Sequence, residues 1–229
     1  MLVKSGLLSQ MSGSLAGVTA ARNRGGQYLR ARTIPVQPGT APQVAIRGHM
    51  STLSTRWVED VTQTQRDDWA VYAVNVSVTN RLGDSVQLSG QQHYLRSNVA
   101  RLLAALDIVD DAPTVFDLGT FTNPTITASA ATQVVTIAFD ATDEWDNETD
   151  SAMLSFISRP QNASINYFKG PYQFLSAAEG VTGTPPAGPD TGTSPFTFIA
   201  GQKLFAQIRV TRADGRYSGI ARVSAIAGA

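Results

Sequence analysis

The spacing of the apolar residues changes near residue 110, and this change constrains the fold more than any other feature of the chain. Between Pro42 and Val109, apolar residues recur every three or four positions, as on one face of a helix. From Asp110 to Ala229 they alternate with polar residues or form short runs, which is typical of strands. Because helices come first and strands follow, the sequence predicts an α+β protein.

Residues 41–109 are predicted to form a small helical bundle. Three apolar stripes at helical spacing indicate three short helices: Ile46, Met50, Leu53 and Trp57; Trp69, Tyr72, Ala73 and Val76; and Tyr94, Leu95, Val99, Leu102, Leu103 and Leu106. Thr62 with Gln65, and Ser89 with Gln92, have the spacing of capping boxes, which satisfy the first free amides of a helix. Residues 81–84 are a turn signal that predicts a small hairpin before the third helix.

Residues 110–229 are predicted to form an immunoglobulin-like β-sandwich. The strand candidates are residues 133–139, 152–158, 172–176, 203–211 and 217–226, and the Pro- and Gly-rich residues 181–195 are expected to form a loop. Asp214-Gly215 is a strong turn signal between the last two strands. The stretch Leu204–Ser218 resembles the last two strands of a fibronectin type III or immunoglobulin-like module, which implies two packed antiparallel sheets.

Residues 1–40 hold few large apolar side chains, and glycine recurs among short residues. Two short strands are predicted on either side of a turn at Asn23–Gly26, because glycine tolerates the positive φ of a tight turn. Pro35 and Pro38 then favour extended chain. Since a segment of this composition cannot bury enough apolar surface to fold alone, we expect an extended arm that packs on another protein.

The formal net charge of zero is an average over oppositely charged parts. All seven charged residues up to Val58 are basic, and all ten from Asp107 to Asp150 are acidic. The arm residues expected to contact a partner are Arg22, Arg24, Tyr28, Arg30 and Arg32. Because arginine pairs with carboxylate and with phosphate, the arm could contact the acidic segment of another copy, or it could bind nucleic acid with Tyr28 stacking on a base. We favour the contact between subunits.

Six carboxylates lie within residues 140–150, which we call the acidic segment. They are Asp140, Asp143, Glu144, Asp146, Glu148 and Asp150. Calcium takes six to eight oxygen ligands, so such a loop could bind a cation, but the glycine at the sixth position of an EF-hand loop is missing. A solvated loop, or a contact for the arginines of a neighbouring arm, is the favoured interpretation, and no metal site is predicted.

The chain has no Cys and only two His, which excludes disulfides and thiolate metal sites and leaves few nucleophile–base pairs. His49 and His93 have no acidic companions at ligand spacing, so structural roles are expected for both. The motifs of α/β-hydrolases, phosphate-binding loops, zinc proteases and dinucleotide-binding folds are absent. The chain contains no run of about 18 apolar residues, which is the length that a membrane-spanning helix needs. We expect no enzyme activity, no cofactor and no membrane partner.

The N-terminal motif resembles a poorly characterised protein family that occurs in bacteriophage and prophage-like gene neighbourhoods. The motif is Asn-Arg-Gly-Gly-x-Tyr-x-Arg-x-Arg at residues 23–32, within Gly17–Pro35. The resemblance continues at Gln43, at Arg47, in Leu53-Ser-x-x-Trp57 and in Thr62-x-x-Gln-Arg-x-x-Trp69-x-x-Tyr72, and more weakly in residues 168–172 and the final hairpin. It implies a virion context, and it carries over no catalytic residue or mechanism.

We therefore expect a bacteriophage virion structural protein, made in the host cytoplasm and located in the particle. The leading hypothesis is a capsid-associated decoration, cement or minor capsid protein, whose partners are other virion proteins and copies of itself. A tail or head–tail connector component is the alternative within this class. A nucleic-acid-binding arm or a glycan-binding sandwich belongs to a different class, and the nucleic-acid version predicts binding that weakens steeply with salt.

Overall fold

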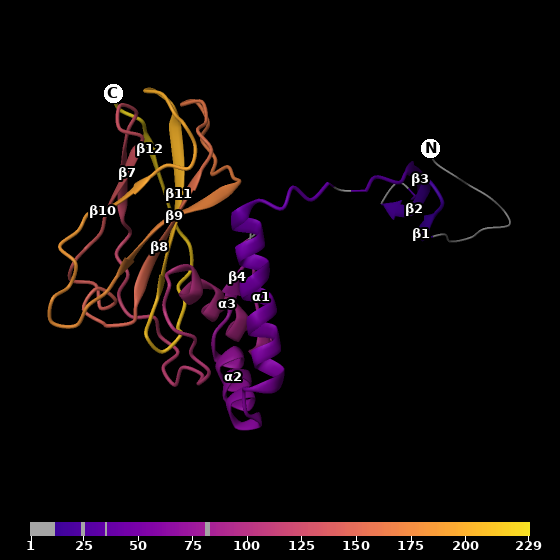
Figure 1. Cartoon of the computed structure of the whole chain (residues 1–229), viewed down its shortest axis with the longest axis horizontal. Helices are drawn as coiled ribbons and strands as arrows, with labels where there is room; N and C mark the ends of the chain where they lie inside the picture. The colour runs from indigo at the N-terminus through magenta and orange to yellow at the C-terminus, as the bar shows by residue number, and fades with distance from the viewer. Residues whose placement is uncertain (1–11, 24–25, 35, 81–82) are drawn as a thin grey trace. The chain divides into compact units, whose positions relative to one another are not determined.

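The computed structural model describes residues 12–23, 26–34, 36–80 and 83–229. The chain forms two compact units, Met1–Val44 and Ala45–Ala229. Within the described ranges lie three helices and twelve strands, and the strands form antiparallel sheets (Figure 1). The protein is therefore of the mixed α+β class, as the spacing of its apolar residues predicts.

The first unit contains a three-stranded sheet in the order β1-β2-β3. Its strands are β1 (Gly13–Leu15), β2 (Val18–Asn23) and β3 (Gly26–Ala31). β2 and β3 pair on either side of the predicted turn, although the turn residues Arg24 and Gly25 lie outside the described ranges. The short strand β1 adds to the predicted hairpin by pairing with β2, and its Gly-Ser-Leu sequence gives no strand signal of its own.

Three helices follow along the chain: α1 (Ala41–Glu59), α2 (Gln63–Asn75) and α3 (Gly90–Leu103). Thr62 and Gln65 exchange hydrogen bonds of 2.9 and 3.3 Å at the start of α2, and Ser89 and Gln92 do the same at the start of α3. Both predicted capping boxes are therefore confirmed. The predicted hairpin between the helices is also present, as β4 (Val78–Thr79) paired with β5 (Ser85–Val86).

The helices pack around the buried aromatic side chains of Trp69, Tyr72 and Tyr94. The predicted stripe on α1 is covered less completely than its spacing suggests. Leu53 is fully buried there, whereas Met50 is 40% exposed. The stripes on α2 and α3 thus form the centre of this core, and α1 contributes mainly through Leu53 and the partly buried Trp57.

Asp110, at the predicted boundary between helices and strands, joins several of these elements. Its carboxylate accepts hydrogen bonds from Nε and Nη2 of Arg56 at 2.8 and 2.6 Å and from the Tyr94 hydroxyl at 3.0 Å. Its carbonyl accepts a hydrogen bond from Nε1 of Trp69 at 2.8 Å. The hydrogen bonds from Arg56 are the main cause that lowers the pKa of Asp110. This residue therefore belongs to the packing of the helices.

The C-terminal part of the chain contains two antiparallel sheets. The three-stranded sheet has the order β10-β7-β6, with β6 (Thr125–Ser129), β7 (Val134–Ala138) and β10 (Asp190–Thr193). The four-stranded sheet has the order β12-β11-β8-β9, with β8 (Ala152–Ser158), β9 (Tyr172–Glu179), β11 (Lys203–Thr211) and β12 (Ala221–Ile226). Every predicted strand is present, and the turn at Asp214-Gly215 is confirmed.

Two strands of these sheets were not predicted, β6 and β10. β10 lies inside the segment 181–195 that was expected to be a loop, so that expectation is wrong for its four residues. Its Asp-Thr-Gly-Thr sequence has no apolar side chain, and the strand forms by backbone pairing with β7. Such a strand is specified by its neighbour, because strand pairing is a tertiary contact.

The two sheets pack face to face around one apolar core. Ile126, Val135 and Ile137 from one sheet contact the same cluster as Met153, Ile157, Leu204, Ala206 and Ile208 from the other. Trp145, in the middle of the acidic segment, is fully buried in this cluster. The acidic segment is therefore anchored to the core by its own tryptophan. The arrangement is that of a β-sandwich.

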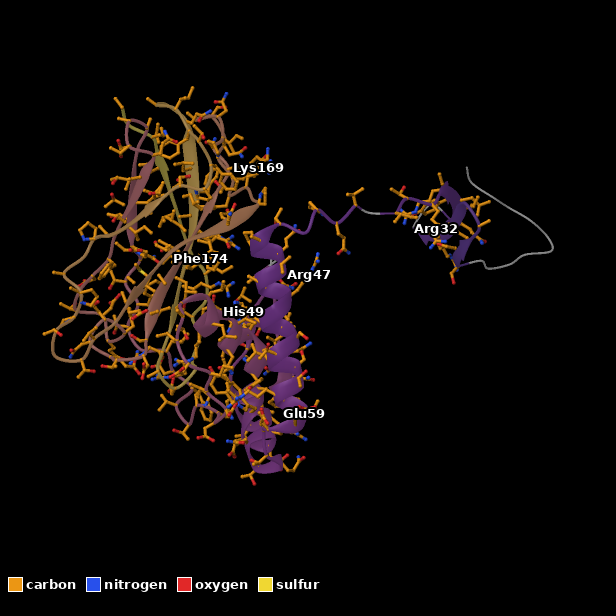
Figure 2. All side chains as sticks on the ribbon, viewed as in Figure 1. Arg32, Arg47, His49, Glu59, Lys169 and Phe174 are labelled. Atoms are coloured by element: carbon orange, nitrogen blue, oxygen red, sulfur yellow. The ribbon has the colours of Figure 1, made fainter. Side chains whose placement is uncertain are left out.

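The helical region and the sandwich, predicted as separate domains at residues 41–109 and 110–229, lie within the same compact unit from residue 45 onward. Ala100 and Ala104 of α3 pack in one buried cluster with Ala152 and Leu154 of β8. Phe174 of β9 borders this cluster (Figure 2). The side of the four-stranded sheet that faces away from the sandwich core is thus covered in part by a helix.

Candidate functional site

The described side chains of the arm are all at least partly exposed. None of the residues from 12 to 44 whose exposure the structure describes is buried. Ile34 is 76% exposed and Val36 is 90% exposed, and both lie in the segment between β3 and α1 that has no helix or strand. Two large apolar side chains thus remain in water on a segment that contributes nothing to the core clusters of the protein.

The predicted basic residues of the arm are divided between the two faces of its sheet. Arg22 pairs with Gln27, and Tyr28 pairs with Ala21, so Arg22 lies on the face opposite to Tyr28 and Arg30. Arg32 follows the end of β3 and donates its backbone N–H to the Gly17 carbonyl at 2.8 Å (Figure 2). Arg24 lies outside the described ranges.

Arg22, Arg30 and Arg32 are exposed, and none of them forms an ion pair within the described part of the chain. The arm therefore presents cationic groups on both faces of a small sheet. Tyr28 and Arg30 share one face of the sheet, because alternate residues of a strand point to the same side.

The six carboxylates of the acidic segment have different surroundings. Asp140 is exposed and accepts two hydrogen bonds from Thr142, and these hydrogen bonds lower its pKa. Asp143 is buried and accepts hydrogen bonds from the backbone N–H and the hydroxyl of Thr122 at 2.8 and 2.9 Å. Asp150 is exposed, and its backbone has a positive φ of 65°. The segment is therefore not a uniformly solvated loop.

Glu144 and Glu148 pair with an arginine of their own chain. Arg212, at the end of β11, donates to Glu144 at 3.0 Å through Nη1 and to Glu148 through Nε. Its Nη1 also donates to the carbonyl of Leu118 at 2.9 Å. Burial lowers the pKa of the Arg212 guanidinium, but the hydrogen bonds to the two glutamates outweigh burial and raise it. These carboxylates therefore stabilise the fold of the chain that carries them.

Two more buried arginines surround Arg212. Arg101 of α3 donates to the carbonyls of Asp107, Asp150 and Arg212 at 2.6, 2.9 and 2.8 Å. Arg216 donates to the Asp214 carboxylate at 2.7 Å and to the Asp117 carbonyl. We call Arg101, Arg212 and Arg216 the arginine cluster. It links α3, the acidic segment and the turn between β11 and β12.

The sequence analysis missed this cluster. Arg101 is 111 positions away from Arg212, to whose carbonyl it donates, and Arg212 is 64 positions away from Glu148. The distribution of charge along the chain predicted that the acidic segment contacts the arm of another copy, because the charged residues of the arm are all basic. The available local signal was the pair of arginines on either side of Asp214-Gly215, because a tight turn brings its flanking residues together.

Asp146 is fully buried, and neither of its carboxylate oxygens has a hydrogen-bond partner within the described residues. Burial is the main cause that raises its pKa, and the neighbouring Asp143 adds to the effect. A buried carboxyl group without a donor is more stable in its neutral form. Asp146 therefore opposes folding when it is ionised.

We expect Asp146→Asn to become more stable relative to the unchanged protein as the pH rises. The pKa of Asp146 in the folded state lies above the ordinary value of 3.8. Compared with Asp146→Asn, the unchanged protein is therefore most stable below pH 3.8, and it loses stability as the pH rises through the raised pKa. Denaturation midpoints of both proteins between about pH 4 and pH 7 measure this difference.

Asp140→Asn is the matched control for this substitution. Since the pKa of Asp140 is lowered from 3.8, any contribution from this residue is lost only at lower pH, so the stability difference for this control should stay nearly constant between about pH 4 and pH 7. A stability difference between Asp146→Asn and the unchanged protein that stays constant over this range would contradict the interpretation of Asp146.

Within the described residues, no three His, Cys, Asp or Glu side chains come together in a way that could hold a metal ion. Asp143 and Asp146 are neighbours, but a third ligand of these types is not beside them. None of the described helices has the length and apolar character that crossing a bilayer requires.

Comparisons with known proteins place few limits on the function. No protein-family model matches the chain, and no curated protein matches it. Among solved structures, a Fn3-like protein from Clostridium thermocellum is 14% identical, and the match covers 47% of this chain and 92% of that chain with a TM-score of 0.30. A likeness at this TM-score does not establish a shared fold. The class of the protein, α+β with a β-sandwich, follows from its own sheets.

Proposed function

We propose that this chain is a structural protein of a bacteriophage particle and that residues 1–40 attach it to other virion proteins, including copies of itself. The arm is the attachment element, and the unit from Ala45 to Ala229 is the compact body that it carries. In the leading version the chain is capsid-associated, as a decoration, cement or minor capsid protein. It is made in the host cytoplasm and acts in the virion.

The observation that carries this proposal is the exposure of the arm. A segment in which no side chain of described exposure is buried is not stabilised by a core of its own. Ile34 and Val36 lose their contact with water when the arm packs on a neighbouring subunit, and that burial favours association. Attachment through an extended segment of this kind is a common mode of protein recognition.

The virion context is supported by the resemblance of the motif at residues 23–32 to a family from phage and prophage neighbourhoods. The body suits a module that faces outward. We assign its sandwich to the fibronectin type III or immunoglobulin-like class, because seven short antiparallel strands form two packed sheets and the chain crosses between the sheets more than once. Such a fold serves many functions, so it is compatible with display without specifying it.

The division of the arginines between two faces favours protein contacts over nucleic acid. A backbone-tracking nucleic-acid site requires a continuous basic surface with an aromatic platform. Here Arg22 lies on the face opposite to Tyr28, so Arg30 is the only arginine of the two described paired strands on the Tyr28 face. A neighbouring subunit can contact both faces of the arm when the arm lies between two proteins.

The copy number in purified particles tests the proposal. We expect mass spectrometry to find the chain in particles from a host that carries its gene, at on the order of hundreds of copies, as expected for a protein that covers a symmetric shell. About six or twelve copies would indicate the head–tail connector instead, because connectors are closed rings. Particles that lack the chain would contradict the proposal as a whole.

A further inference from the structure

A cleft of about 560 Å³ lies in the second unit between the hairpin β4–β5, α3 and the C-terminal strands. We call it the basic cleft. Arg96 of α3, Arg209 of β11 and Arg222 of β12 line it together with Tyr217. Its volume lies within the range of small-molecule sites, about 300 to 1,000 Å³. Three different elements therefore direct arginines to one cavity of ligand size.

Tyr217 holds two of these arginines in place. The guanidinium carbon of Arg96 lies 4.7 Å from the centre of the Tyr217 ring, and that of Arg209 lies 5.1 Å from the same ring. Nη1 of Arg96 also donates to the Tyr217 carbonyl at 3.2 Å, and Nη2 donates to the Ser218 carbonyl at 2.9 Å. Among the described residues, these contacts use two of the five N–H donors of Arg96, which leaves up to three for a ligand.

The positive charges of the basic cleft have no protein counterion among the described residues. No Asp or Glu oxygen lies within ion-pair distance of Arg96, Arg209 or Arg222, and no described Asp or Glu lines the cleft. The pKa of Arg96 is lowered by burial and by the nearby Arg209. Like charges that are held close together favour an anion between them.

Other arginines of the same unit provide a contrast. Arg56 pairs with Asp110, Arg212 with Glu144 and Glu148, and Arg216 with Asp214. The unit thus pairs these three arginines with carboxylates of its own, and the buried Arg101 donates to three carbonyls instead. In the basic cleft it places three arginines together and leaves their charge open to an external anion.

We propose that the basic cleft binds a small ligand through a phosphate-type oxoanion, with Arg96, Arg209 and Arg222 as its contacts. A single bidentate arginine satisfies a carboxylate, whereas three guanidinium groups from three elements match an anion with more oxygens and more charge. Leu118 and Ile220, which also line the cleft, provide apolar contacts for the rest of the ligand. This site is independent of the arm and of its attachment role.

Isothermal titration calorimetry of the full chain at low salt tests the proposal, with inorganic phosphate, AMP and citrate as probes. We expect phosphate and AMP to bind, and AMP to bind more tightly because its nucleoside adds contacts. Arg209→Gln and Arg222→Gln are each expected to weaken binding by about tenfold or more, since each removes hydrogen bonds to a charged group. Arg209 is partly exposed and Arg222 is exposed.

Arg30→Gln and Arg159→Gln are the matched controls, because they remove one positive charge from exposed positions elsewhere. Unchanged affinity in these two variants supports a local site. Absence of binding, or equal losses in all four variants, would overturn the proposal. Citrate binding as tightly as AMP would overturn the phosphate-type assignment. A short single-stranded oligonucleotide that binds more tightly than AMP, and loses affinity in the cleft variants, would contradict a small ligand.

Discussion

Arg101→Met is expected to lower the free energy of unfolding by about 3 kcal/mol. The side chain is 2% exposed, and its guanidinium donates to the carbonyls of Asp107, Asp150 and Arg212. Methionine fills much of the same volume but donates no hydrogen bond, so these carbonyl oxygens lose a partner in a place that water does not reach easily. Chemical denaturation followed by circular dichroism measures the loss.

Arg47→Met makes the same chemical change at an exposed position of α1 (Figure 2). This control is expected to change the stability by no more than about 0.5 kcal/mol. Arg101→Lys should fall between the two, because an ammonium group cannot reproduce the planar fork that reaches several carbonyls. A loss for Arg101→Met no larger than that for Arg47→Met would show that Arg101 does not fasten α3 to the sandwich.

Deletion of residues 1–40 is expected to reduce incorporation into phage particles to the background of the assay, while the remaining body stays folded. The buried core clusters contain no residue of the described part of the arm, so the deletion removes no core contact. The far-ultraviolet spectrum and the melting temperature of the body should therefore stay close to those of the full chain. Incorporation is measured by quantitative mass spectrometry of purified particles.

Two finer variants separate the forces that act in the arm. Serine at Ile34 and Val36 removes the exposed apolar side chains, and glutamine at Arg22, Arg30 and Arg32 removes the exposed charges. Loss of incorporation in the first variant indicates burial on a neighbour, and loss in the second indicates ion pairing with one. Normal incorporation of the chain that lacks residues 1–40 would contradict attachment through the arm.

Much of the helical part was predictable, because its signals are local. The capping boxes at Thr62 and Ser89 depend on residues three positions apart, and both are formed. The stripe on α1 was predicted less well. Its spacing shows which face is apolar, but whether Met50 is covered depends on the position of another helix, which the spacing does not contain.

The strands also divide into those with a local sequence signal and those that depend on tertiary pairing. β8 and β11 have apolar residues and were predicted, whereas β10 has none and forms by pairing with β7. The acidic segment was interpreted as one solvated or contacting loop, since six carboxylates occur together. Its burial follows from Trp145, which packs into the sandwich core and brings Asp143 and Asp146 with it.

The basic cleft could not be predicted from the sequence, because it forms from residues that are distant along the chain. Arg96, Arg209 and Arg222 come from a helix and two strands, and Arg96 is 121 positions away from the Tyr217 carbonyl to which it donates. The amino-acid order alone established the class of the protein, its helix caps, its last hairpin and the opposite charges of the arm and the acidic segment. These features depend on neighbours along the chain. Which charges meet, and which remain without a partner, depended on the packing of distant segments, because electrostatic contacts require proximity in space.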